Sequence, residues 1–81
     1  MKLLTLHPSA NPYEPTVWKV DGLAICELQG MITWSYDMGL YTAISKEIFE
    51  DKDTALNDFF ECFPKCRGKY AFKKGDQAGS G

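Results

Sequence analysis

The stretch "TVWKVDGLAICELQ", residues 16–29, decides the fold class of this chain. Two apolar runs that are rich in β-branched residues, 16–20 and 23–29, are separated by Asp21 and Gly22. An Asp-Gly pair between two such runs is among the strongest short-range hairpin signals, because both residues accept the positive φ of a tight turn. The stretch therefore predicts two antiparallel strands joined by a two-residue turn.

Two further strand patterns lie on either side of this hairpin. Residues 2–7 predict a short edge strand, and three prolines within residues 8–15 then exclude both a helix and a central strand. Residues 31–36 predict another strand, after a bulge or bend at Gly30. Alternation along that strand places three large side chains on one face: Ile32, Trp34 and Tyr36.

Two weaker strand patterns follow. Residues 40–49 fit both a strand and a helix, and we favour the strand because a turn precedes them and they are rich in β-branched residues. Residues 69–74, "KYAFKK", alternate well enough to predict a final strand.

The segment "DKDTALNDFFECF", residues 51–63, predicts the principal helix. At about 100° per residue its apolar side chains form one continuous arc. That arc contains Ala55, Leu56, Phe59, Phe60, Cys62 and Phe63. Asp51 or Asp53 would cap the N-terminus of the helix, where a carboxylate also meets the positive end of the helix dipole. Pro64 ends the helix near Phe63.

These elements predict an α+β fold in a single domain, residues 1–75. We expect a small antiparallel sheet of three to five strands, with one principal amphipathic helix packed on one face. A content of 44% hydrophobic and 14% aromatic residues supports a folded chain. Residues 76–81, "DQAGSG", are small and polar and predict a flexible tail or a remnant of cloning.

The run "WSYDMGLYTAISKEIFEDKDTAL", residues 34–56, resembles small ββα units in its spacing. The matching positions are Trp34, Gly39, Ser45, Phe49, Lys52 and Ala55. Such units include the arm-type DNA-binding domains of phage integrases, whose DNA-reading sheets are more basic than this one. The resemblance covers about a quarter of the chain and implies a strand–strand–helix order. It assigns no functional residue.

Charge and composition exclude several classes of protein. A net charge of −2 argues against a dedicated binder of nucleic acid or anionic membranes. No apolar run approaches the about 18 residues that cross a bilayer, and the apolar start, residues 1–7, is too short for a signal-peptide core. Three cysteines, an odd number at low density, fit a reducing compartment. We therefore expect a cytoplasmic protein that does not contact membranes.

The stretch "ECFPKCRGKY", residues 61–70, is the nearest thing to a chemical motif. The spacing of Cys62 and Cys66 is allowed in a zinc site, but a closed site needs four ligands. It would have to use Cys26, Cys62, Cys66 and His7, drawn from three separate elements. We interpret the stretch as a helix end and Cys26 and Cys62 as small core residues, and we expect no metal and no cofactor. A zinc-stabilised adaptor is the weakest alternative.

Catalytic groups are not recognisable. His7 is the one histidine of the chain, and no serine or cysteine lies in a pattern that would pair it with this base. The glycines are scattered turn residues and form no phosphate-binding loop. We therefore expect that the protein is not an enzyme.

The leading hypothesis is a non-enzymatic protein-binding module that docks on another protein or on itself. Strand parity leaves Trp18, or Trp34 with Tyr36, on the sheet face that the helix does not cover, and exposed aromatic side chains anchor interfaces. The expected partner-binding residues are Trp18, Trp34, Tyr36, Tyr41, Glu50, Asp51 and Asp53. Small size and the lack of catalytic groups suggest a phage- or plasmid-type inhibitor that occludes a host protein complex.

The alternative is a nucleic-acid-binding accessory domain. Residues 65–74 carry five bases and no acid: Lys65, Arg67, Lys69, Lys73 and Lys74. Tyr70 and Phe72 lie between these basic residues. The lysines would therefore contact phosphates, while the two rings stack on nucleic-acid bases. A competing interpretation is an edge strand that lysines protect from aggregation, and the acidic remainder of the chain favours it.

Overall fold

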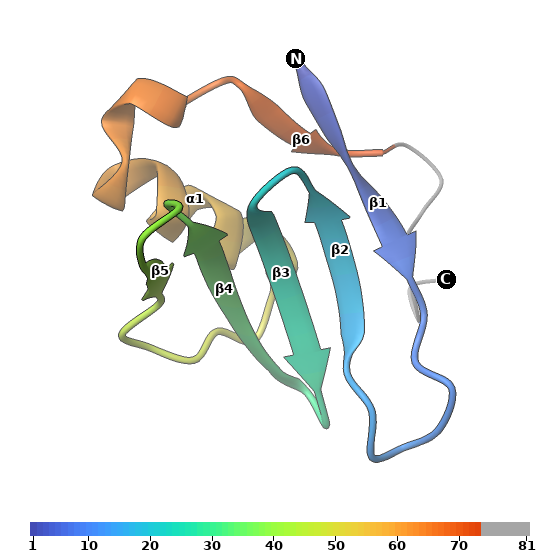
Figure 1. Ribbon diagram of the computed structural model, residues 1–81. Helices are drawn as coiled ribbons and strands as arrows, with labels where there is room; N and C mark the ends of the chain where they lie inside the picture. The colour runs from blue at the N-terminus through green and yellow to red at the C-terminus, as the bar shows by residue number, and fades with distance from the viewer. Residues whose placement is uncertain (74–81) are drawn as a thin grey trace.

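The computed structural model describes residues 1–73 as one six-stranded sheet with a single helix behind it (Figure 1). The strands are β1 (Lys2–His7), β2 (Thr16–Val20), β3 (Leu23–Leu28), β4 (Met31–Asp37), β5 (Thr42–Ile44) and β6 (Tyr70–Phe72). Helix α1 (Lys52–Cys62) is followed by the short 3-10 helix η1 (Pro64–Cys66). The order across the sheet is β5-β4-β3-β2-β1-β6. The predicted tail, residues 76–81, lies outside the described residues.

The predicted α+β class, with one helix and a mostly antiparallel sheet, is confirmed. The sheet is larger than expected, with six strands, and it is mixed, because β1 pairs antiparallel with β2 and parallel with β6. β1 therefore lies inside the sheet, and the prediction of an edge strand at residues 2–7 is wrong. Its second neighbour comes from the other end of the chain, and no local pattern in the sequence encodes that pairing.

The hairpin at Asp21 and Gly22 is confirmed, with Val20 paired opposite Leu23. Asp21 adopts a positive φ of 50°. Gly22 has no left-handed φ, and a different constraint requires glycine there: a Cβ atom would lie 2.9 Å from the backbone oxygen of Asp37. The Asp37 N–H also donates to the Gly22 carbonyl at 2.9 Å. The glycine thus allows β4 to approach the turn.

The core lies between the sheet and α1. The pairing register aligns Trp18, Ile25 and Trp34 across β2, β3 and β4, on the face that the helix covers. Phe59 of α1 is fully buried, and its ring lies 5.3 Å from that of Trp34 and 5.0 Å from that of Tyr36, centroid to centroid. The buried set comprises Leu4, Trp18, Leu23, Ile25, Ile32, Trp34, Ala55, Leu56, Phe59 and Phe60.

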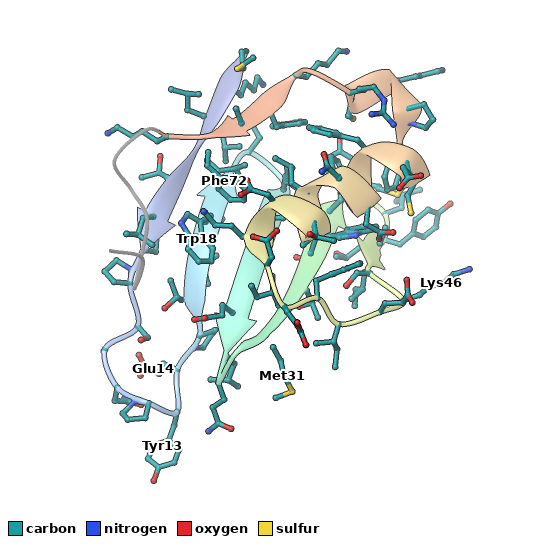
Figure 2. All side chains as sticks on the ribbon, turned by 180° about the vertical axis from the view of Figure 1, so that it is seen from behind. Tyr13, Glu14, Trp18, Met31, Lys46 and Phe72 are labelled. Atoms are coloured by element: carbon teal, nitrogen blue, oxygen red, sulfur yellow. The ribbon has the colours of Figure 1, made fainter. Side chains whose placement is uncertain are left out.

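Both tryptophans belong to this core, so the expectation that one of them lies on the uncovered face is wrong. Trp18 and Trp34 are each 3% exposed, and Figure 2 shows Trp18 next to Phe72 beside the helix. Tyr36 is half-buried on the same side. Alternation correctly puts Ile32, Trp34 and Tyr36 on one face, but it does not tell which face the helix covers.

Residues 40–49 form a short strand and then a loop. β5 pairs with β4 through three residues, which confirms a strand for that part alone. The chain leaves the sheet at residues 46–48 and returns for an isolated bridge between Phe49 and Ile32. The edge of β4 is therefore covered by two separate pieces of backbone.

Helix α1 begins directly after Asp51, whose carboxylate accepts hydrogen bonds from the backbone N–H groups of Asp53 (3.3 Å) and Thr54 (3.2 Å). Asp51 is thus the cap, and Asp53 lies in the first turn. The helix ends at Cys62, before Pro64, as predicted. Cys62 was expected on the buried arc, but it is exposed, because clefts border the last turn of α1 on both sides of this residue.

Candidate functional site

The β5 edge of the sheet gathers exposed apolar side chains. Residues 1–73 contain nine exposed large apolar side chains, and five of them fall within residues 38–48. We call these five the apolar edge: Met38, Leu40, Tyr41, Ile44 and Ile48. Leu40 is 92% exposed and Tyr41 70%. Single exposed apolar residues are ordinary, whereas a group of them marks an interaction site.

The backbone of β5 leaves hydrogen-bonding groups unpaired at the same edge. The Ser45 N–H donates to the Trp34 carbonyl at 2.9 Å. Because bonded pairs alternate along an antiparallel ladder, this bond fixes the N–H and C=O of Ala43 toward β4 and those of Thr42 and Ile44 away from it. β5 is the last strand on this side of the described sheet, so its outward groups are accessible to an added strand.

The two edges of the sheet differ in protection. Lysines beside an edge strand oppose pairing with other chains, and Lys69 and Lys73 directly flank β6. Residues 38–45, by contrast, contain no charged residue and no proline. Lys46, the first basic residue after this run, points away from the body of the molecule in Figure 2. Both edge strands have three residues, so length does not distinguish them, and β5 is the less protected edge.

Two clefts adjoin this edge on the side of the helix. The larger has a volume of about 520 Å³ and is lined by Tyr36, Met38, Cys62, Phe63, Pro64, Lys65 and Cys66. The smaller, about 300 Å³, is lined by Trp34, Ala43, Ile44, Lys46, Glu47, Asp58, Cys62 and Phe63. Cys62 and Phe63 contribute to both, so the clefts meet at the last turn of α1. Of the two clefts, the smaller is the one that β5 lines, through Ala43 and Ile44.

Negative charge outweighs positive charge at the smaller cleft, where two carboxylates face one lysine. Asp51 and Asp53 lie at the other end of α1, beside Lys52, whose ammonium covers the rings of Trp18 and Phe72. Glu47 and Asp58 line the smaller cleft, and one oxygen of Asp58 accepts a hydrogen bond from the Trp34 indole N–H at 2.8 Å. In residues 1–73 the one ion pair joins Lys2 to Asp21, so no carboxylate at this edge is neutralised by one.

Two titratable side chains of the sheet, Tyr36 and Cys26, have raised pKa values. A hydrogen bond with the Tyr70 hydroxyl, helped by burial and by the neighbouring Cys66, raises the pKa of Tyr36 to about 12. Burial raises the pKa of the Cys26 thiol on the other face of the sheet. Neither group is therefore activated as a base or a nucleophile near neutral pH.

The structure divides the residues that were expected to bind a partner. Trp18 and Trp34 are buried, and Tyr36 is half-buried; none of them is placed to anchor a partner from the surface. The exposed members are Tyr41, Glu50, Asp51 and Asp53. Sequence reasoning missed four residues of the apolar edge: Met38, Leu40, Ile44 and Ile48. The signal that would have indicated them is the uncharged run at residues 38–45.

The sheet face that the helix leaves uncovered differs from expectation. The outward side chains at its centre, on β2, β3 and β4, are Val17, Lys19, Ala24, Cys26, Thr33 and Ser35. These side chains are small, aliphatic or polar, and none is aromatic. The centre of this face therefore offers no ring that would anchor a partner, which leaves the β5 edge as the stronger candidate site.

The basic stretch exposes its charges, while its two rings are half-buried against the core. Lys65, Arg67, Lys69 and Lys73 are exposed, and Lys74 lies outside the described residues. The ring of Tyr70 lies 6.0 Å from that of Phe59, and the ring of Phe72 lies 5.9 Å from that of Trp18. The Lys52 ammonium covers Phe72 at 4.9 Å from the ring centroid. A nucleic-acid base would have to displace these contacts in order to stack.

The described residues meet neither the requirements of a metal site with three or more protein ligands nor those of a membrane-spanning helix. In the described part of the chain, no three histidine, cysteine or acidic side chains come together in a group that would hold a metal ion. Cys26, Cys62 and Cys66 are free thiols. None of the helices formed by residues 1–73 has the length and apolar character that crossing a membrane requires.

Comparison of the chain with protein-family models, with curated proteins and with solved structures finds no match. The order β4–β5–α1 does agree with the strand–strand–helix order that the resemblance of residues 34–56 implies.

Proposed function

We propose that this protein is a non-enzymatic protein-binding module that docks through the apolar edge. The observation that carries the proposal is the gathering of five exposed large apolar side chains at the less protected β5 edge. Interface cores are enriched in aromatic side chains and methionine, and tyrosine is a frequent anchor. Tyr41 is the anchor that we expect, with Leu40 and Ile44 beside it.

The apolar edge contains enough surface to support a specific complex. Burying a leucine or isoleucine side chain contributes about 1.5–3 kcal/mol before the costs of association. Leu40, Ile44 and Ile48 are all more than half exposed, so most of that gain is still available to them. Their gross contribution is comparable with the about 8 kcal/mol of a micromolar complex.

Two narrower questions depend on the partner. An inhibitor that occludes a host complex is one form of this proposal, and the identity of the captured protein decides it. The nucleic-acid alternative keeps phosphate contacts by Lys65, Arg67, Lys69 and Lys73 but loses base stacking, since both rings pack inward. We also propose a cytoplasmic location, because free thiols suit a reducing compartment.

The test is an affinity pull-down of the tagged protein from a native lysate of its source, with and without nuclease. We compare the wild type with Tyr41→Ser and with Tyr13→Ser, a control in the β1–β2 loop whose ring is 84% exposed. We expect a stoichiometric protein band that survives nuclease, disappears with Tyr41→Ser and persists with Tyr13→Ser. Recovery of nuclease-sensitive material alone would overturn the proposal in favour of the basic stretch.

A further inference from the structure

We infer that the occupant of the apolar edge is an extended, basic segment of a partner protein, which adds to β5 as a further strand. The inference rests on the proposed function, because it assumes that this edge binds protein. It goes further by naming the conformation and the charge of the bound segment.

The outward backbone groups of β5 favour an extended occupant. The N–H and C=O of Thr42 and of Ile44 point away from β4, so a strand laid beside them forms hydrogen bonds with both residues. A helix cannot do this, because its own backbone groups are bonded within the helix. Strand addition of this kind takes affinity from the backbone and specificity from alternate side chains.

The surroundings of β5 favour alternating apolar side chains in that segment. Successive side chains of an added strand point to opposite faces of the sheet. Those on the helix side reach the smaller cleft, beside Ala43, Cys62 and Phe63. Those on the other side lie over Ile44, which is 65% exposed. Each face of the sheet therefore offers an apolar contact to every second side chain of the added strand.

Charge favours a basic partner over a second copy of this chain. The smaller cleft is lined by two carboxylates, Glu47 and Asp58, against one lysine, Lys46. Two copies that paired through β5 would bring these carboxylates together, whereas lysine or arginine in a partner would face them favourably. The opposite edge, β6, is flanked by lysines and does not attract such a segment.

The probe is a peptide selected from a random library displayed on phage. The library is panned on the full-length protein and depleted on the Tyr41→Ser variant, and the affinity of the selected peptide is measured by fluorescence anisotropy. We expect alternating apolar residues with an excess of lysine and arginine. Two versions of the peptide are then compared, one N-methylated at the odd positions and one at the even positions. The version whose methylated N–H groups face β5 should bind about tenfold more weakly or worse, and the other should bind almost as well as the unmodified peptide.

Two matched pairs of variants complete the test. Thr42→Pro removes an outward N–H and no bond to β4, so it should weaken binding about tenfold, whereas Thr42→Ala should have little effect. Glu47→Lys should weaken binding about two- to fivefold, and Glu14→Lys, the same change in the β1–β2 loop, should not. Circular dichroism verifies that each variant is folded.

Several results would overturn the inference: selected peptides that are acidic, affinity that ignores both N-methylation and Thr42→Pro, or no peptide that requires Tyr41. Sedimentation that reveals a dimer broken by Thr42→Pro would also overturn it, because the occupant would then be a second copy. None of these results affects the pull-down. The proposed function fails separately, if the captured protein is retained equally by Tyr41→Ser and the wild type.

Discussion

The hydroxyl groups of Tyr36 and Tyr70 connect β4 to the C-terminal strand, and their contact makes a prediction about pH. The hydrogen bond with Tyr70, together with burial and the neighbouring Cys66, raises the pKa of Tyr36 from 10.0 to about 12. Because the folded pKa lies above the unfolded one, the stabilisation is complete below pH 10 and is lost as the pH rises from 10 to 12. Tyr70→Phe should lower the pKa of Tyr36 in an NMR titration of labelled tyrosine. Tyr13→Phe should leave it unchanged, and an equal response to both variants would contradict this account.

Trp34 shows what residue type alone does not decide. A tryptophan has an apolar body and a polar tip, so it suits a core and an interface equally. Its position is settled by Asp58 of α1, which accepts the indole hydrogen bond at 2.8 Å from a helix 24 residues away in sequence. Tyr41, with similar chemistry, lies beside a glycine turn at the sheet edge and stays exposed.

At the scale of the element, the start of α1 depends on one carboxylate. The hydroxyl of Thr54 and the backbone N–H groups of Asp53 and Thr54 lower the pKa of Asp51. Asp51→Ala should therefore reduce the free energy of unfolding by about 1 kcal/mol, as measured in urea at pH 7. The control Asp53→Ala keeps the cap and should cost less. Since the folded pKa lies below the usual value, the effect of Asp51→Ala should vanish as the pH falls through that pKa. Equal costs for the two variants would exclude the cap.

The elements that sequence patterns predict best are those with local signals. The hairpin at Asp21 and Gly22, the helix over residues 52–62 and its end before Pro64 all follow from neighbouring residues. The pairing of β1 with β6 could not be predicted, because it joins strands at opposite ends of the chain through three residue pairs. β5 is shorter than its pattern, since the chain leaves β4 after Ser45.

At the scale of the whole molecule, the two edges of one sheet carry opposite chemistry. β6 is flanked by lysines, while β5 is apolar and lines a cleft with two carboxylates. The candidate site lies at the β5 edge, and Tyr41 is the one partner-binding residue predicted from the sequence that belongs to it. The rest required the strand order, because a residue's exposure at an edge depends on which strand comes last.

The most direct test of the central claim is a site-specific photo-cross-link in the native lysate. A photoreactive phenylalanine analogue is introduced at Leu40, the most exposed residue of the apolar edge, and separately at Tyr13, which lies on the opposite side of the molecule from Lys46 (Figure 2). If partners dock at the β5 edge, irradiation should give a discrete protein adduct with the probe at position 40 and none with the probe at position 13. Adducts at position 13 alone, or none at either position, would contradict the account.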